Sequence, residues 1–242
     1  MLVKLENPTL LSKAVDIISE LVTEVRIKVN GEGMSITAID PANVAMVGFN
    51  IKKNSFSQFE TDGEILGVNL ESLKRILRRC DSKSSLILEK RGENLLNITI
   101  QDVIKRNFIL SLIDIESESR EMPELDFNTK VEINSDDLIT SIEDCIVVSD
   151  ACSFIINNGK FIIESRGLDS ATSEFSGEKV KIEGEDFKSR YSLEYLSKFI
   201  KGAKLCDKTI LKSSNNHPLR LEFRNEQMEL VFILAPRVED EN

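Results

Sequence analysis

The sequence lacks any long apolar run. No stretch of its 242 residues approaches the roughly 20 consecutive apolar residues that a membrane-spanning helix needs. The opening segment Met1–Glu6 also has no apolar targeting region and no small-residue cleavage site. We therefore expect neither secretion nor contact with a membrane.

Histidine and closely spaced cysteines, the usual metal and redox residues, are nearly absent. The single histidine, His217, precedes Pro218 in a turn-like segment, which suits a loop residue better than a general base. The four cysteines lie in or beside apolar runs without CxxC spacing, which favours buried, reduced thiols: Cys80, Cys145, Cys152 and Cys206. We expect no metal site and no cofactor.

Catalytic motifs are missing as well. The chain has no GxSxG, Walker loop or HExxH segment. Gly31-x-Gly33 lacks both the third glycine and the following helix of a dinucleotide site, so it indicates a turn. Acidic residues are plentiful but scattered. We therefore expect a protein that is not an enzyme.

Positive charge is in short supply. The net charge of −10 argues against a protein that coats nucleic acid with its whole surface, because phosphate binding requires cations. It leaves open a protein that gathers its few cations on one face, since the distribution of charge decides which partners bind.

An internal repeat is the most informative feature that the sequence does contain. Residues 70–78 return as residues 193–201 at a shift of 193 − 70 = 123. At the same shift Ile87-Leu88 falls on Ile210-Leu211, and apolar residues of 96–100 fall on 219–223. One residue later, Phe108-Ile109-Leu110 returns as Phe232-Ile233-Leu234. These four segments, repeated in order, indicate two homologous halves, each of ordinary domain size.

Hydrophobic periodicity predicts the same plan in both halves. Helices are expected at 7–22, 70–80, 135–149 and 192–201, with short alternating strands between them. The acidic, serine-rich stretch around Pro123 has no periodicity and indicates a linker. We predict an α+β fold with helices on one face of antiparallel sheets. The domains are expected at 1–114 and 129–242, joined by a connecting loop at 115–128.

The helix at 70–80 carries the strongest charge pattern. At about 100° per residue its apolar residues share one arc. The opposite arc carries one acid, Glu71, and four cations: Lys74, Arg75, Arg78 and Arg79. This helix alone fits equally well a solvated face favoured by the helix dipole or a surface that binds an anion. Lys198 and Lys201 recur in the second copy and favour the functional interpretation, whereas residues 135–149 contain acids and no cation.

Several segments together resemble the sliding clamps of the proliferating cell nuclear antigen type, most of all the archaeal ones. They are the duplicated basic helix, Gly33–Pro41, Gly67–Leu70, Leu112–Asp114, and the ending Leu234-Ala235-Pro236-Arg237 with its acidic tail. The resemblance covers essentially the whole chain. It implies two homologous clamp domains, with inner helices packed on outer antiparallel sheets, that assemble into a pseudo-sixfold ring.

The resemblance also implies a function and its residues. Three subunits would form a homotrimeric ring around double-stranded DNA, which would thread through without sequence preference. The positions that would face DNA are Lys13, Lys74, Arg75, Arg78, Arg79, Lys198 and Lys201. An edge strand of each domain would form the contact between subunits, at Phe108, Ile109, Leu110, Ser111, Thr172, Glu174 and Phe175.

In this family, partner enzymes dock through short peptide motifs. The resemblance implies a DNA polymerase, a clamp loader, a flap nuclease and a ligase as partners in DNA replication and DNA repair. The matching positions are Ile39, Asp40, Asn43, Val44, Met46, Met122, Pro123, Leu125, Leu234, Ala235 and Pro236. The alternative for Val44 and Met46 is a place in the core.

Two other interpretations stay open from the sequence. The chain could be a subunit of a heteromeric clamp, either checkpoint-like or heterotrimeric, because residues 135–149 lack a cation and strand 170–176 is short and polar for an interface. It could also be an unrelated acidic scaffold with a duplicated fold. The clamp interpretation places it in the cytoplasm, associated with the nucleoid, in an archaeon, or in the nucleus in a eukaryote.

Overall fold

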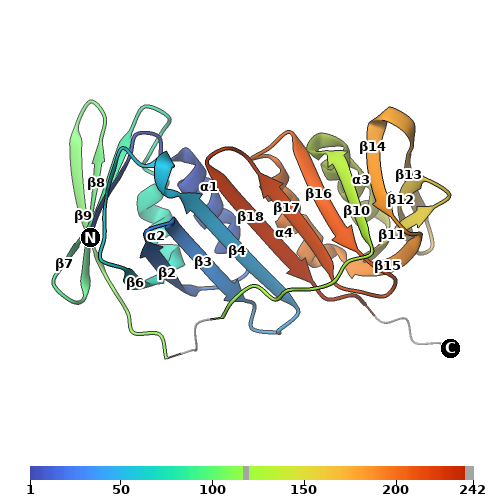
Figure 1. Cartoon of the computed structure of the whole chain (residues 1–242), viewed down its shortest axis with the longest axis horizontal. Coiled ribbons are helices and arrows are strands. Elements are labelled where there is room, and N and C mark those ends of the chain that lie inside the picture. The colour runs from blue at the N-terminus through green and yellow to red at the C-terminus, as the bar shows by residue number, and fades with distance from the viewer. Residues whose placement is uncertain (117–119, 238–242) are drawn as a thin grey trace. The chain divides into compact units, whose positions relative to one another are not determined.

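The computed structural model describes residues 1–116 and 120–237, so the acidic tail that follows Arg237 lies outside the described residues. The chain forms two compact units (Figure 1). Of the described residues, the first unit contains 1–41, 47–116, 120–122 and 226–229, and the second contains 42–46, 123–225 and 230–237. The domain boundaries expected from the sequence stay a prediction.

The first half of the chain contributes two helices and nine strands, together with one short 3-10 turn (η1). In chain order they are β1 (Leu2–Leu5), α1 (Thr9–Ile18), β2 (Glu24–Asn30), β3 (Gly33–Ile39), β4 (Ala45–Lys52), η1 (Lys53–Ser55), β5 (Gln58–Glu60), β6 (Glu64–Asn69), α2 (Leu70–Leu77), β7 (Ser85–Arg91), β8 (Leu95–Gln101) and β9 (Lys105–Ser111).

The second half repeats this series. In chain order it contains β10 (Thr129–Asn134), α3 (Ser135–Val148), β11 (Ala151–Asn157), β12 (Lys160–Arg166), β13 (Ser170–Phe175), η2 (Gly177–Lys179), β14 (Val180–Gly184), β15 (Phe187–Ser192), α4 (Leu193–Ala203), β16 (Lys208–Ser213), β17 (Leu219–Arg224) and β18 (Met228–Leu234).

The strand topology confirms the duplication. In the first half, strands follow the orders β5-β1-β7-β8-β9 and β4-β3-β2-β6. In the second half, the orders β14-β10-β16-β17-β18 and β13-β12-β11-β15 repeat them strand for strand. The register agrees with the sequence repeat, because β6 at 64–69 shifted by 123 gives 187–192, the bounds of β15. The α+β class with helices on antiparallel sheets is confirmed.

The helices pack in pairs within each unit, α1 against α2 and α3 against α4, and cover one face of the unit's sheet layer (Figure 1). Their apolar sides are buried, as the 3.6-residue period predicts. In the second unit the ring of Phe199 on α4 stacks on that of Phe232 on β18, with centroids 4.3 Å apart. The opposite side of each helix pair carries the polar residues.

Two helices end earlier than the sequence predicts. α1 stops at Ile18, although Leu21 and Val22 are still buried in the turn that follows. α2 begins at the cap Asn69, whose side chain accepts the Ser72 N–H at 3.0 Å, and ends at Leu77. The cations at 78 and 79 therefore belong to the turn after the helix.

Candidate nucleic-acid interface

The first unit gathers five predicted DNA-facing cations on its helix pair. Lys13 on α1 and Arg75 on α2 are exposed, as are Arg78 and Arg79 just after α2. Lys74 is mostly covered, with 15% of its side chain exposed. Because the buried arc of α2 is formed by leucines, these cations lie on the side away from the sheet. The exposed side of the helix pair is therefore basic in a chain of net charge −10.

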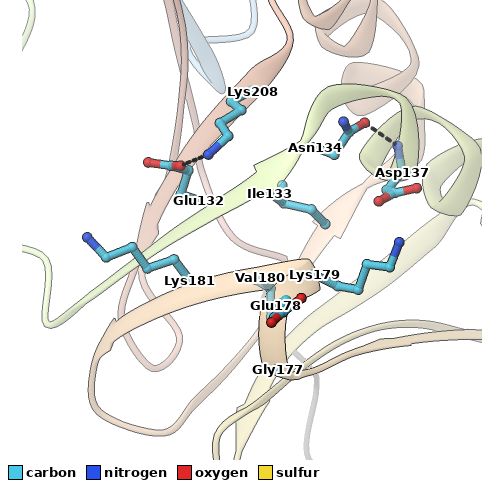
Figure 2. Close-up of a pocket in the computed structure, with 10 residues that line it drawn as sticks. All are labelled: Glu132, Ile133, Asn134, Asp137, Gly177, Glu178, Lys179, Val180, Lys181 and Lys208. Atoms are coloured by element: carbon cyan, nitrogen blue, oxygen red, sulfur yellow. Dashed lines mark hydrogen bonds and ion pairs between the residues drawn. The ribbon is translucent and has the colours of Figure 1, made fainter.

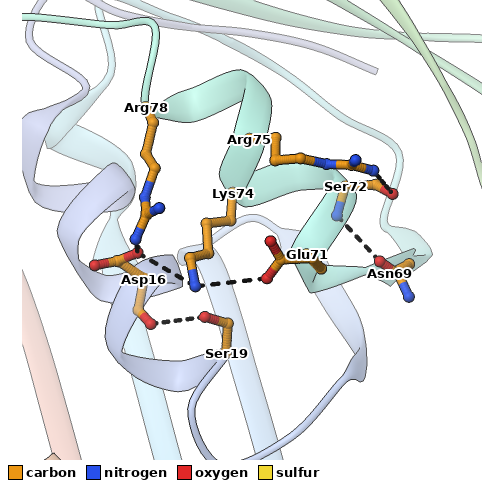
Figure 3. A network of polar contacts seen from close by, with 8 residues as sticks. All are labelled: Asp16, Ser19, Asn69, Glu71, Ser72, Lys74, Arg75 and Arg78. Atoms are coloured by element: carbon orange, nitrogen blue, oxygen red, sulfur yellow. Dashed lines mark hydrogen bonds and ion pairs between the residues drawn. The ribbon is translucent and has the colours of Figure 1, made fainter.

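The five cations differ in their partners (Figure 3). Asp16 on α1 contacts two of them: its Oδ1 lies 3.6 Å from the Lys74 Nζ and accepts the Arg78 Nε at 3.1 Å. The Lys74 Nζ also lies 3.5 Å from a Glu71 oxygen. Arg75 instead donates to the Ser72 hydroxyl at 3.3 Å. Within residues 1–116 and 120–237, the side chains of Lys13 and Arg79 meet no carboxylate.

The second unit places its two predicted cations on α4. The Lys198 Nζ lies 5.2 Å from the centre of the Tyr195 ring and 3.4 Å from a Glu194 oxygen. Lys201, one turn further on, is exposed. At the position equivalent to Arg79 the chain has Gly202 (79 + 123), where an added Cβ would lie 2.7 Å from the Phe223 ring. Close packing therefore excludes a cation at that position.

The acidic helix α3 packs against α4 in the second unit. The Asn134 side chain caps it by accepting the Asp136 N–H at 2.9 Å and the Asp137 N–H at 3.4 Å. Acids in the first turn interact favourably with the helix dipole, which accounts for these two aspartates. Glu143 and Asp144 are also exposed, so α3 offers no attractive surface to phosphate.

Hydrogen bonds hold residues 235–237 in place within the second unit. The Ala235 N–H donates to the Val44 carbonyl at 2.9 Å, and the Arg237 N–H donates to the Arg190 carbonyl at 2.7 Å. The Arg237 guanidinium also contacts Asp150 at 2.8 Å and holds the pKa of that carboxyl below its usual value.

Exposure separates the remaining candidates in this unit. Asn43 is exposed with φ of 56°, and Leu234 is completely buried in the core. The other candidate residues in this unit are half-buried: Val44, Met46, Pro123, Leu125, Ala235 and Pro236.

The first unit contains the other three peptide-binding candidates. Ile39 at the end of β3 is half-buried, and Asp40 beside it is buried. Met122 packs on β4 at Gly48, where an added Cβ would lie 3.0 Å from the Met122 Cγ. The glycine therefore makes room for the methionine side chain against the strand backbone.

Both segments predicted to join subunits lie at sheet edges. β9 ends one sheet and β13 ends another within the described parts of the chain. On β9 the Ile109 side chain is 69% exposed and Leu110 is buried, with Phe108 half-buried and Ser111 exposed. On β13, Thr172 and Glu174 are exposed and Phe175 is half-buried. Each edge offers unpaired backbone groups to another strand.

A separate cleft of about 470 Å³ lies in the second unit between β10, β14 and the start of α3 (Figure 2). Its lysines and acids balance: Lys208 pairs with Glu132, and Lys179 and Lys181 share the wall with Glu178 and Asp137. Because these charges balance, the cleft favours neither an anionic nor a cationic ligand.

Among residues 1–116 and 120–237, no three His, Cys, Asp or Glu side chains gather as a metal site. In the same ranges no helix is long and apolar enough to cross a bilayer. Cys145 and Cys152 are buried, whereas Cys80 and Cys206 are half-buried. Burial raises the pKa of Cys80 to about 11, so its thiol stays protonated.

Comparison with known proteins identifies the family. The models for the N-terminal and C-terminal domains of proliferating cell nuclear antigen match residues 1–120 and 121–238. The chain is 36% identical over 229 residues to a "DNA polymerase sliding clamp" of Thermococcus onnurineus, covering 92% of each chain. It is 36% identical over 237 residues to one of Pyrococcus furiosus, covering 95% of each.

A solved structure agrees with these relatives. The crystal structure of the proliferating cellular nuclear antigen from Entamoeba histolytica superposes with a TM-score of 0.91 at 25% identity, covering 98% of both chains. Both halves of the sequence thus match the two family models in order, and the fold matches over nearly the full length. The chain belongs to the proliferating cell nuclear antigen family.

Proposed function

We propose that this chain is a sliding clamp that encircles double-stranded DNA and tethers a DNA polymerase as a processivity factor. The observation that carries the proposal is the basic surface on α1 and α2 in an otherwise acidic chain. Relatives named DNA polymerase sliding clamp support it. The clamp acts without catalysing a reaction itself.

The basic surface suits a protein that must move along DNA. Lysine and arginine contacts to phosphate carry no sequence information, and they weaken as salt rises because bound counterions are released. A ring stays on DNA through its closed topology, so modest phosphate contacts suffice. Strong contacts to bases would instead stop it from sliding.

Ring closure is proposed to use the two edge strands. β9 of one subunit would pair with β13 of the next, which leaves neither edge open to aggregation. Repeating this head-to-tail contact closes a ring when the rotation between subunits permits it. We propose a homotrimer; the names of the relatives do not favour a heteromeric checkpoint-like ring.

The peptide-binding assignment is part of the proposal. A short partner motif would insert an apolar side chain near Val44 and Met46 and run beside the chain end at Ala235 and Pro236. The half-buried state of these residues supports it, because such side chains leave apolar surface for a ligand to cover. The polymerase, clamp loader, flap nuclease and ligase would share this mode of docking.

A charge reversal tests the DNA surface. Arg75→Glu should reduce clamp-stimulated synthesis by a DNA polymerase on primed circular DNA, while circular dichroism and the mass in solution stay unchanged. Lys52→Glu, an equal charge change at an exposed site on β4, is the matched control. Stimulation that is equal in the Arg75→Glu protein, the Lys52→Glu protein and the wild type would contradict the assignment.

A further inference from the structure

Asp16 has an unusual position in the proposed DNA surface. The buried residues of α1 form one arc, and at about 100° per residue Asp16 lies near the middle of the opposite arc. Its side chain is 38% exposed, so the carboxylate faces away from the core. An acid therefore stands among the cations that would meet DNA.

The contacts of Asp16 are with two of those cations from α2 and its following turn. A single carboxylate oxygen meets the Lys74 Nζ at 3.6 Å and accepts the Arg78 Nε at 3.1 Å (Figure 3). The Nη2 of Arg78 donates to the same oxygen. Arg78 thus turns its guanidinium edge toward α1, although 58% of its side chain is exposed.

This arrangement places a carboxylate in the role that a phosphate would have. Both groups are anions that present oxygens to guanidinium and ammonium donors at hydrogen-bonding distance. Neither Lys74 nor Arg78 can direct the same donors to DNA while it directs them to Asp16. Arg75 instead contacts the neutral hydroxyl of Ser72, and within residues 1–116 and 120–237 no carboxylate competes for it.

We propose that Asp16 is an internal competitor for DNA phosphate that occupies Lys74 and Arg78 and so limits how strongly the clamp holds DNA. The inference rests on the proposed function and adds a residue that sets its strength. Asp16 is a positioning residue, because it acts through the two cations and not by touching DNA. Weaker binding to DNA would allow the ring to slide along the duplex.

The test is retention on DNA as a function of salt. Asp16→Asn keeps the shape of the side chain and removes its charge, so Arg78 loses its carboxylate partner and Lys74 keeps only Glu71. We expect salt-resistant retention on nicked circular DNA to rise about threefold to tenfold, since an ion pair with an exposed partner is a weak competitor. The slope of log retention against log salt concentration should become steeper, by the amount expected for about one to two additional phosphate contacts. A purely structural role for Asp16 would leave that slope unchanged.

Two controls isolate the mechanism. Glu93→Gln makes the same change in net charge at an exposed turn between β7 and β8, and should leave the salt slope unchanged. Asp16→Glu keeps the charge, so its retention on DNA should equal that of the wild type. In a protein with Lys74→Gln and Arg78→Gln, Asp16→Asn should have no further effect, because the residues through which it acts are gone.

The outcomes separate this inference from the proposed function. If Arg75→Glu weakens retention but Asp16→Asn leaves retention and slope at wild-type values, Asp16 is no competitor and the clamp assignment stands. A gain that persists without Lys74 and Arg78 would also overturn the inference. If Arg75→Glu leaves retention unchanged as well, the DNA surface itself is wrong and both proposals fall.

Discussion

At the residue scale, the cations of the proposed DNA surface are not equivalent. Lys74 lies between two carboxylates and is largely covered, whereas the Arg79 side chain meets no carboxylate within residues 1–116 and 120–237. The Arg79 carbonyl, moreover, accepts a hydrogen bond from Arg106 at 3.1 Å, which fixes the backbone at that point. Availability to phosphate therefore differs along one helix and the turn that follows it.

This difference predicts a ranking. Arg79→Gln should make the slope of log retention against log salt concentration shallower, by the amount expected for the loss of about one phosphate contact. Lys74→Gln should change this slope by clearly less. Measuring retention on circular DNA over a salt series gives both slopes. Equal slopes for the two variants would show that the contacts of Lys74 are broken when DNA enters.

The sequence could predict the cations but not their partners. The helical period alone places Lys74, Arg75, Arg78 and Arg79 opposite the apolar arc, because they lie within ten residues of one another. Asp16 is more than fifty positions earlier, and only the packing of α1 against α2 brings it to Arg78. Long-range pairing of charged side chains leaves no periodic signal.

Glu222 on β17 is the clearest case of a charge held inside the fold. Its side chain is 1% exposed, and it contacts Lys212 at 2.9 Å, Arg220 at 2.6 Å and Arg224 at 2.9 Å. Burial alone would raise the pKa of Glu222, but the hydrogen bonds from Lys212 and Arg220 and the charge of Arg224 outweigh burial and hold this pKa below its ordinary value of 4.5. The ionised form is therefore favoured by folding.

Glu222→Gln should lower the free energy of unfolding at pH 7 by about 1–3 kcal/mol, because three cations lose a buried, charged partner. Since the folded-state pKa is depressed, the contribution is present above pH 4.5 and is lost as pH falls through the folded-state pKa. Urea denaturation at pH 7 and pH 3 should show the difference from wild type shrinking in acid. Glu226→Gln, on an exposed turn, is the control.

At the element scale, patterns with a clear period were predicted best. All four helices were expected within a few residues of their bounds, because each has an apolar stripe of adequate length. β1 and β10 were missed, although they occupy equivalent places next to β7 and β16. Each is only four to six residues long and is followed by a helix within four residues, so the local alternation is too short to separate the strand from the helix.

The edge of β6 shows how a glycine positions the start of the linker. The Ile113 N–H donates to the Gly67 carbonyl at 2.9 Å, and an added Cβ at Gly67 would lie 2.0 Å from the Ile113 oxygen. The Arg26 guanidinium also donates to the Ile115 carbonyl. Only glycine lets residues 113–115 run this close to the strand.

Gly67→Ala should therefore displace the segment and lower the free energy of unfolding by about 1–3 kcal/mol, the usual range for overpacking. Faster hydrogen exchange at the Ile113 amide would locate the effect. Gly31→Ala, where an added Cβ meets nothing within 4 Å, should be nearly neutral. A loss of stability as large in Gly31→Ala would mean that close packing at Gly67 is not the cause.

At the scale of the whole molecule, the proposed ring would be closed by two exposed edge strands, β9 and β13. Light scattering over a concentration series should give about three times the 27.3 kDa mass of the chain. Ile109→Glu should reduce this mass to that of one chain, because a charge on the β9 edge opposes strand pairing. Ile65→Glu, at a side chain of similar exposure on β6, should leave the assembly intact. A wild-type chain that stays monomeric would favour a heteromeric ring.

The pair formed by Arg79 and Gly202 has a consequence for how duplicated proteins diverge. When a chain contains two copies of a fold, one copy can lack a property that the other copy has. Here the turn after the first basic helix carries a charge at Arg79, whereas the equivalent position in the second copy, Gly202, packs tightly against Phe223. Gly202→Arg would make the two copies alike at this position, but the new side chain would collide with Phe223 and disrupt the packing of the second copy. The charge it added would only repeat the one that Arg79 already provides.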